Sequence, residues 1–298
     1  MYHSYIFANK CIKTDLSSES IKSGNGNGNK KWAIVALIKP SRAKVNRRNE
    51  LIAEMLKKFG TNRNVTIIFF SEEKFEESKV KSWQKQFAGF PVRTVDTSSR
   101  GFNPPHQRYG YKYMCKFFTL DMYEYLEPYD YYMRVDTDCH IVKLDYNVFD
   151  WAEKNEVQYG WGTRKLEPHG PTKSTLPVWT QKYIENCGLY PSAPMDQDLS
   201  TCFNFYNNFH IGDINFFRRA DVKHFLTSVN ASGFIQSHRW GDSTIQAYAV
   251  RLFMNPSAIR YLPDFEYIHG SHGNRLVSTF GKGEKSDVPQ RLPLWKTS

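Results

Sequence analysis

The first half of the chain alternates continuous apolar runs with amphipathic segments. Largely apolar runs, typical of buried strands, occupy 31–39, 65–70 and 131–135, and residues 91–95 are expected to form a short strand between the last two. Between these runs, apolar residues recur every three or four positions, which predicts helices over 49–59, 75–87 and 109–126. The apolar stripe of the last helix is expected to pack in the core. This order of elements predicts βαβ units and an α/β fold with a largely parallel sheet.

The pattern changes at both ends of this region. Residues 1–30 end in a Ser-Gly-Asn-Gly-Asn-Gly-Asn run, which predicts a flexible link. Residues 139–298 lose the alternation of strands and helices and become rich in Pro and Trp, with one clear helical pattern over 244–253. The sequence therefore predicts a flexible segment (1–30) followed by a single domain (31–298).

Composition sets the class of protein. With 298 residues and 40% hydrophobic content, the chain can bury a substantial core. The longest clean apolar run, 33–38, is too short to cross a bilayer, and the N-terminus lacks an apolar segment long enough for a secretory signal. If Met1 is the true start, these features predict a cytoplasmic protein without a transmembrane span.

The five cysteines lack the spacing of a zinc site. Their odd, sparse set favours reduced thiols, although a bridge such as Cys187 to Cys202 remains open.

The net charge of +10 is concentrated near the N-terminus, where residues 1–64 hold 13 Lys/Arg and four Asp/Glu. Such a basic region could attract a phosphorylated ligand, an anionic membrane surface or nucleic acid. The sequence has no zinc finger, RNP-like motif or helix-turn-helix signal, which argues against nucleic acid. Peripheral membrane contact through the basic N-terminal region stays open.

Two aspartates follow the last predicted strand of the first half. Asp136 and Asp138 share one side of the chain, and a bend after Asp136 would let both carboxylates converge on one divalent cation. In open α/β sheets ligands bind beyond the carboxyl ends of strands, so this pair suits a cation that holds a nucleotide diphosphate. A second Asp-x-Asp at 196–198 follows two prolines and no strand, which predicts a turn. The pattern indicates a glycosyltransferase that uses a sugar nucleotide.

Several further motifs occur in a fixed order. They are Phe69-Phe70-Ser71-Glu72-Glu73-Lys74-Phe75, Tyr111-x-x-Met114-Cys115-Lys116-Phe117, Tyr131-Tyr132-Met133-Arg134-Val135-Asp136-Thr137-Asp138, Asn208-Phe209-His210-Ile211-Gly212-Asp213, Arg239-Trp240-Gly241-Asp242 and Tyr267-Ile268-His269. Over residues 32–272 this series resembles the fungal α-1,2-mannosyltransferases of glycosyltransferase family 15. The resemblance implies a GT-A-like (Rossmann-like) mixed sheet flanked by helices, a GDP-mannose donor, Mn²⁺ (or Mg²⁺), and transfer with retention to a glycan or glycoprotein hydroxyl.

The chain departs from that family in three respects. The family usually has Glu-Pro-Asp at the metal, whereas this chain has Asp136-Thr137-Asp138, which keeps two carboxylates at the same spacing. Family members carry a glutamate, the candidate nucleophile, where this chain has His210, and histidine is a poor substitute for a carboxylate at an oxocarbenium-like centre. Family relatives are also anchored in the Golgi, whereas this sequence shows no anchor.

The candidate donor-site residues combine both lines of reasoning. Asp136 and Asp138 are expected to bind the metal, and the resemblance adds His269, the counterpart of a family metal ligand. Lys39 and Arg42, which follow the first strand, are expected to contact the nucleotide or its phosphates, together with Arg134 and Asp136. Residues 31–138 are accordingly expected to bind the nucleotide, and 139–298 the acceptor.

Four residues are candidates for catalysis: His210, which stands at the position of the family glutamate, and Asp242, Asp213 and Tyr111. Asp242 is interpreted either as a helix N-cap or as the carboxylate that faces the acceptor hydroxyl. Asp213, three residues after His210, could replace the missing glutamate or could be a turn residue. Tyr111 matches a family tyrosine near the reaction centre, and it could equally pack against a helix.

Other functions remain open at this stage. The donor could be another nucleotide sugar, such as a UDP-sugar, and the configuration could be inverted. The loss of the family glutamate also leaves a catalytically silent carbohydrate-binding protein as an alternative.

Overall fold

A computed structural model of the chain describes residues 30–38, 45–61, 63–87, 89–98, 110–189 and 199–269, with side chains from residue 49 onward in the second range. Lys39, Arg42, the glycine-rich link and the second Asp-x-Asp lie outside the described residues. Within the described part, no helix is both long and apolar enough to span a membrane.

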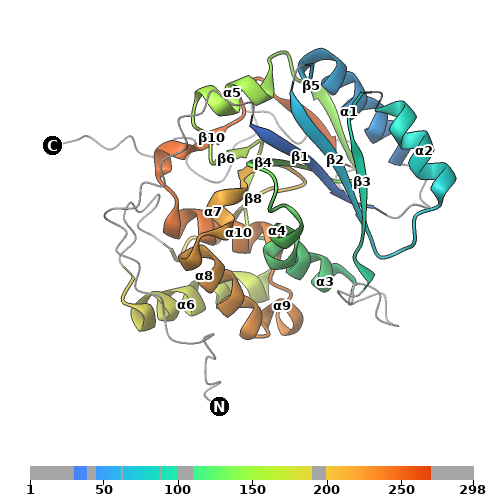
Figure 1. Cartoon of the computed structure of the whole chain (residues 1–298). Helices are drawn as coiled ribbons and strands as arrows, with labels where there is room; N and C mark the ends of the chain where they lie inside the picture. The colour runs from blue at the N-terminus through green and yellow to red at the C-terminus, as the bar shows by residue number, and fades with distance from the viewer. Residues whose placement is uncertain are drawn as a thin grey trace.

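A seven-stranded mixed sheet forms the centre of the protein (Figure 1), in the order β10-β6-β9-β4-β1-β2-β3. Its strands are β1 (Lys31–Leu37), β2 (Asn64–Ser71), β3 (Val92–Asp96), β4 (Tyr131–Val135), β6 (Tyr159–Trp161), β9 (Phe209–Asp213) and β10 (Ile259–Tyr261). The first four are mutually parallel, and β9 runs antiparallel to β4 and β6. The predicted parallel strands and the mixed sheet of the GT-A-like class are confirmed.

Two short antiparallel ribbons extend this framework. The first pairs β5 (Cys139–Lys143) with β11 (Glu266–His269), and the second pairs β7 (Arg164–Leu166) with β8 (Phe203–Phe205). The first ribbon joins segments more than 120 residues apart in sequence. It therefore brings the end of the described chain back to the strand that follows β4.

Helices cover both faces of the sheet. On one face lie α1 (Val45–Phe59), α2 (Glu77–Gln86) and α5 (Val148–Lys154). The other face carries α3 (Gly110–Lys116), the π-helix η2 (Phe117–Asp121), α4 (Met122–Tyr125), α6 (Gly170–Cys187), α7 (Ile214–Arg218), α8 (Ala220–Ala231), α9 (Phe234–Ser237) and α10 (Asp242–Phe253). A 3-10 turn, Pro256–Ala258, precedes β10.

Alternation along the central strands divides the core into two layers. Trp32, Ile34 and Ala36 of β1 pack with the first helix layer, whereas Ala33 and Val35 pack with the second. The continuous apolar runs seen in the sequence are therefore strands that are buried on both faces. On β4 the same alternation turns Tyr132 and Arg134 toward the layer that contains α3 and α10.

The helix predicted over 109–126 is interrupted. It consists of α3, a five-residue π-helical turn and α4. The apolar residues of 109–126 also fit a continuous α-helix, so their periodicity does not reveal the π-turn. The interruption faces the polar site described next.

Candidate functional site

The Asp136-Thr137-Asp138 segment forms a tight turn from β4 into β5. The Asp136 N–H donates to the Asn208 carbonyl at 2.9 Å, and the Cys139 N–H donates back to the Asp136 carbonyl at 3.0 Å. The turn lies at the carboxyl end of β4. In the parallel order β3-β2-β1-β4, strands β2 and β3 are added on one side of β1 and β4 on the other, so the strand order switches between β1 and β4. This is the edge at which α/β sheets bind ligands.

Asp138 meets His269 beyond this turn. The ribbon register pairs His269 with Cys139, which sets the imidazole beside the preceding residue, Asp138. His269 Nε2 lies 3.1 Å from Asp138 Oδ1, and this hydrogen bond lowers the pKa of the Asp138 carboxyl. The Tyr206 hydroxyl lies 3.5 Å from Nδ1, on the other side of the ring. The imidazole is thus oriented with Nε2 toward the carboxylate.

Asp136 faces a different partner. Arg134 Nε and Nη2 donate to its two carboxylate oxygens at 2.8 and 3.2 Å. Among the described residues, no three His, Cys, Asp or Glu side chains are grouped closely enough to hold a metal ion. The structure therefore brings together two of the three predicted metal ligands, Asp138 and His269, whereas the third, Asp136, is hydrogen-bonded to Arg134.

The donor set still fits a hard divalent cation. A carboxylate oxygen of Asp138 and an imidazole nitrogen of His269 face each other, and the Asp138 side chain is 35% exposed. Asp136 supplies a second carboxylate from the same turn. Oxygen ligands with one imidazole suit Mn²⁺. A diphosphate and water would complete such a coordination shell.

Arg134 connects the turn to helix α10. Its side chain is 1% exposed, and Nη1 donates to Asp242 Oδ2 at 2.5 Å. The guanidinium also lies 3.5 Å from the ring centroid of Phe118, in the π-helical turn. One buried cation therefore joins Asp136, from the first half of the chain, to Asp242, from the second.

Asp242 is not the cap of its helix. Gly241 occupies the N-cap position, and Asp242 is the first residue of α10, with its carboxylate turned inward. The same Oδ2 accepts a hydrogen bond from Asn207 Nδ2 at 2.8 Å. The side chain is 5% exposed. The interpretation as an N-cap is therefore wrong.

Tyr111 lies beside this helix start and remains accessible. It is 42% exposed, and the Arg239 guanidinium lies 4.4 Å from its ring centroid. Its hydroxyl is 3.4 Å from the position that a Cβ on Gly241 would take. Tyr111 is therefore a surface aromatic next to Asp242 rather than a core-packing residue.

His210 is fully buried in the core. It is 0% exposed, and Nδ1 donates to the Asn207 carbonyl at 2.9 Å, so Nε2 must accept from the Tyr132 hydroxyl, also at 2.9 Å. Burial lowers the pKa of His210 to about 3, so the ring is neutral at physiological pH. Because both nitrogens are occupied, His210 is not a nucleophile, and its candidate catalytic role is corrected.

Asp213 is a structural residue. It caps α7 by accepting the Asn215 N–H at 2.8 Å. It pairs with Tyr131 at the start of β4, whereas Asp136 follows the other end of that strand. The length of the strand separates the two carboxylates, so Asp213 does not replace the family glutamate.

Two buried amides were missed in the sequence. Asn207 Nδ2 donates to both Asp242 and Gln246, and Gln246 is 0% exposed one helical turn after Asp242. The i, i+4 spacing of Asp242 and Gln246 was the available signal, because it places both side chains on one helix face.

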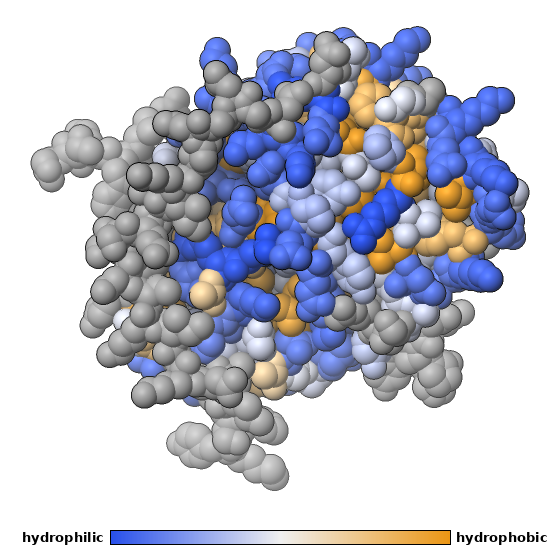
Figure 2. Space-filling model, viewed as in Figure 1, coloured by the Kyte–Doolittle hydropathy of each residue, from blue (hydrophilic) through white to orange (hydrophobic). Residues whose placement is uncertain are grey.

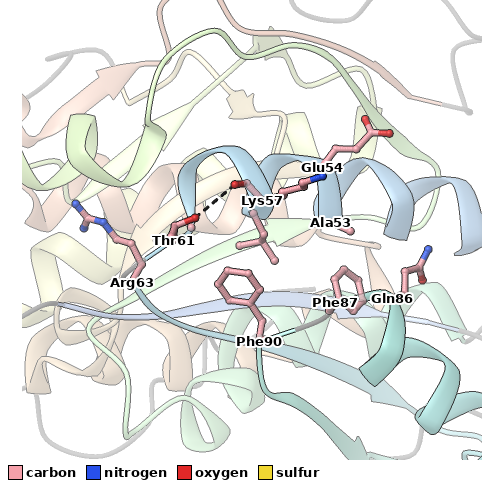
Figure 3. Close-up of a pocket in the computed structure, with 11 residues that line it drawn as sticks. Ala53, Glu54, Lys57, Thr61, Arg63, Gln86, Phe87 and Phe90 are labelled. Carbon is pink, nitrogen blue, oxygen red and sulfur yellow. Dashed lines mark hydrogen bonds between the residues drawn. The ribbon is translucent and has the colours of Figure 1, made fainter.

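A separate pocket of about 700 Å³ lies between α1 and α2 (Figure 3). Phe87 and Phe90 point into it beside Lys57 and Thr61, and none of the candidate site residues lines it. In Figure 2, apolar residues show mainly on this side of the molecule, while much of the remaining described face is hydrophilic. The pocket is not part of the Asp136 site.

Comparison with known proteins places this geometry in context. Residues 102–276 match the family described as glycolipid 2-alpha-mannosyltransferase. The chain is 29% identical over 171 residues to glycolipid 2-alpha-mannosyltransferase 1 of Candida albicans, a match that covers 54% of this chain and 39% of the relative. It is 27% identical over 176 residues to glycolipid 2-alpha-mannosyltransferase of Saccharomyces cerevisiae, covering 55% and 40%. The matched region thus spans about two fifths of these relatives.

Solved structures share the fold. Core-mannan synthase A from Aspergillus fumigatus, in an Mn/GDP form, superposes with a TM-score of 0.66 at 21% identity, covering 90% of this chain and 81% of that one. The mannosyltransferase Ktr4p from S. cerevisiae gives a TM-score of 0.65 at 21% identity, covering 80% and 70%.

The relatives correct the expected location. They are Golgi mannosyltransferases that act on glycans in the lumen, so the expectation of a cytoplasmic protein is wrong.

Cys202 is a free thiol, which excludes the bridge to Cys187, but Cys187 is itself disulfide-bonded. A disulfide is typical of an oxidising compartment such as the secretory pathway.

Proposed function

The chain belongs to the glycolipid 2-alpha-mannosyltransferase family, and from that premise we propose that it is a glycosyltransferase that moves mannose from GDP-mannose to a glycan hydroxyl. The observation that carries the proposal is the Asp136–Asp138 turn at the carboxyl end of β4, with His269 delivered to Asp138 by a distant strand. Core-mannan synthase A, which shares this fold, was solved with Mn and GDP.

The donor side is assigned to the turn and the ribbon. Asp138 and His269 would hold Mn²⁺, and Asp136 would contribute from the same turn once its hydrogen bonds to Arg134 rearrange or a water intervenes. Bound Mn²⁺ would supply positive charge to the diphosphate as it leaves. Lys39 and Arg42 remain proposed phosphate contacts that lie outside the described residues.

The acceptor side is assigned to the start of α10. Tyr111 offers an exposed aromatic ring, against which a sugar can stack, directly beside Asp242. Asp242 would bind the acceptor hydroxyl or take its proton, and the hydrogen bond from Arg134 holds its carboxylate in place. Residues 31–138 would accordingly supply most of the donor site, and 139–298 the acceptor site together with His269.

The buried His210 restricts the mechanism. A double displacement needs a carboxylate or other nucleophile at the anomeric carbon, and His210 has neither exposure nor a free nitrogen. Transfer would therefore proceed without a covalent intermediate at this position.

Ligand-dependent thermal stability tests the proposal. A ligand at 100 times its Kd adds about 2.7 kcal/mol of stability, which corresponds to a rise in Tm of about 5 °C for a domain of this size. We expect GDP with Mn²⁺ to raise Tm by this order, with GDP alone and UDP with Mn²⁺ giving less. Incubation with labelled GDP-mannose and a mannoside should then yield an elongated glycan.

Two variants locate the site. Asp138→Asn and His269→Gln should each abolish the Mn²⁺-dependent part of the shift while leaving the Tm without ligand nearly unchanged. Asp145→Asn, which alters an exposed carboxylate beyond the ribbon, is the matched control and should behave as the wild type. A larger shift with UDP would transfer the proposal to a UDP-sugar, and the absence of any nucleotide effect would refute it.

A further inference from the structure

Gln246 occupies a junction of buried hydrogen bonds beneath the site. Its Nε2 donates to the Phe118 carbonyl at 2.9 Å and to the Tyr123 hydroxyl at 3.2 Å, and its Oε1 accepts from Asn207 Nδ2 at 3.2 Å. All three polar sites of the amide are therefore used, and its orientation is fixed. Reversing the amide would set its oxygen against the Phe118 carbonyl, which cannot donate.

The first set of contacts through Gln246 forms a closed ring that includes the Arg134–Asp242 ion pair. On one side, Asn207 Nδ2 bridges Gln246 to Asp242 Oδ2, the oxygen that also receives Arg134. On the other side, Gln246 holds the backbone of Phe118, whose ring packs against the Arg134 guanidinium. Gln246 thus fixes both members of the ion pair, one through an amide and the other through an aromatic ring.

The second set of contacts runs through position 210. His210 donates to the Asn207 carbonyl and accepts from Tyr132, whose hydroxyl lies 3.4 Å from that of Tyr123, and Tyr123 accepts from Gln246. The two backbone carbonyls can only accept, so they determine the direction of the hydrogen bonds. The amide of Gln246 is shared by both closed sets.

The π-helical turn is part of this arrangement. In an α-helix the Met122 N–H would donate to the Phe118 carbonyl, four residues earlier, whereas in this π-turn it donates to the Phe117 carbonyl. Gln246 donates to the Phe118 carbonyl from α10, 128 residues away in sequence. The π-helical turn is therefore hydrogen-bonded to helix α10 through Gln246.

We propose that Gln246 is a positioning residue that sets the geometry of the Arg134–Asp242 pair, and that His210, in place of the family's carboxylate, anchors Gln246 through Asn207 and the two tyrosines. Gln246 touches no ligand, because its side chain is buried. It acts through groups that face the donor turn and the acceptor side. The effect on turnover rests on the proposed function, whereas the effect on Arg134 does not.

The test compares two variants of α10 in the full chain. Gln246→Met fills the same volume without an amide and breaks both sets of contacts. Tyr248→Phe is the matched control, because Tyr248 is equally buried two residues later, and its hydroxyl contacts, among them the hydrogen bond to the Leu199 carbonyl at 2.8 Å, lie outside both sets. Gln246→Glu, nearly the same shape, provides a second variant should the methionine protein fail to fold.

Two measurements are made on each protein. In ¹H–¹⁵N spectra, the Arg134 Nε–H signal, assigned by its loss in Arg134→Lys, should shift or broaden in the Gln246 variants and stay in place in Tyr248→Phe. In transfer assays, kcat should fall about 10- to 100-fold in the Gln246 variants, as expected for misplaced groups, while the KM for the donor stays within about twofold.

The outcomes separate the two proposals. An unshifted Arg134 signal in both Gln246 variants overturns the positioning role, whatever the enzyme does. A fall in kcat that Tyr248→Phe reproduces shows a general loss of packing and also overturns it. If the wild type transfers no sugar, the proposed function fails, and the Arg134 signal still decides the role of Gln246.

Discussion

Arg134 sets the charge balance of the site at the scale of single residues. It is shared by Asp136 and Asp242, so one buried guanidinium faces two carboxyl groups. Arg134 and His210 are register partners on adjacent strands and lie on the same face of the sheet. A glutamate at position 210 would bring a third carboxylate to this face, whereas the neutral ring leaves the balance unchanged.

The neutral state of His210 predicts a dependence of stability on pH. Its pKa is about 3 when folded, against 6.5 in an unfolded chain, so the unfolded state binds more protons between these values. Stability from this residue is complete above about pH 6.5 and is lost as pH falls toward 3, by up to about 1.4 kcal/mol per unit.

His210→Gln isolates this contribution. Glutamine can donate to the Asn207 carbonyl and accept from Tyr132, but it does not titrate. Urea unfolding of both proteins at pH 7.5 and 5.0 should show the wild type losing about 2 kcal/mol more than the variant over that range. Equal losses in the two proteins would mean that His210 is protonated in the folded state.

At the scale of elements, the sequence pattern was informative where the structure is local. The strands of the first sheet half were predicted to within about two residues, because β1, β2 and β4 are largely apolar runs that are buried on both faces. The π-turn was not predicted, because the apolar residues of 109–126 also fit a continuous α-helix. Interruptions of this kind depend on a partner such as Gln246, which lies far away in sequence.

At the site, too, local features could be predicted from the sequence, whereas contacts between distant segments could not. Asp136 and Asp138 follow a strand and could be placed at the sheet edge from sequence, whereas the meeting of Asp138 and His269 depends on pairing of β5 with β11. Only the family resemblance pointed to that histidine. Asn207 and Gln246 were overlooked because an amide reveals its role only when its buried partners are known.

The pairing of β4 with β9 depends on a glycine. Gly212 faces Tyr132 across the two strands, and a Cβ at this position would overlap the tyrosine ring. We expect Gly212→Ala to destabilise the protein by at least about 1–3 kcal/mol, the usual cost of overpacking, with a lower urea midpoint. Gly170→Ala, where a Cβ meets nothing within 4 Å, should leave the midpoint nearly unchanged.

At the scale of the whole molecule, the two halves of the chain share one sheet. The strand β4 lies between β1 from the first half and β9 from the second, and the contact of Arg134 with Asp242 crosses the same boundary. The β5–β11 ribbon, in contrast, is paired only with itself among the described strands. The donor site thus combines an interior strand with a less supported ribbon.

This difference predicts an order of hydrogen exchange. Amides of β1 and β4, each hydrogen-bonded between two strands, should exchange slowest, and those of β11 roughly tenfold faster or more. GDP with Mn²⁺ should slow exchange in β11 most, since His269 lies at its end. Mass spectrometry of peptic peptides can measure both effects, and a β11 that is unaffected by the nucleotide would contradict the assignment of His269.

The hydrogen bonds that surround His210 also bear on how this branch of the family can evolve. The Nδ1–H of His210 donates to the Asn207 carbonyl, so replacing His210 alone with glutamate would place an anion against that carbonyl. Descendants of this sequence should therefore inherit His210, Asn207 and Gln246 as a set, or exchange them together.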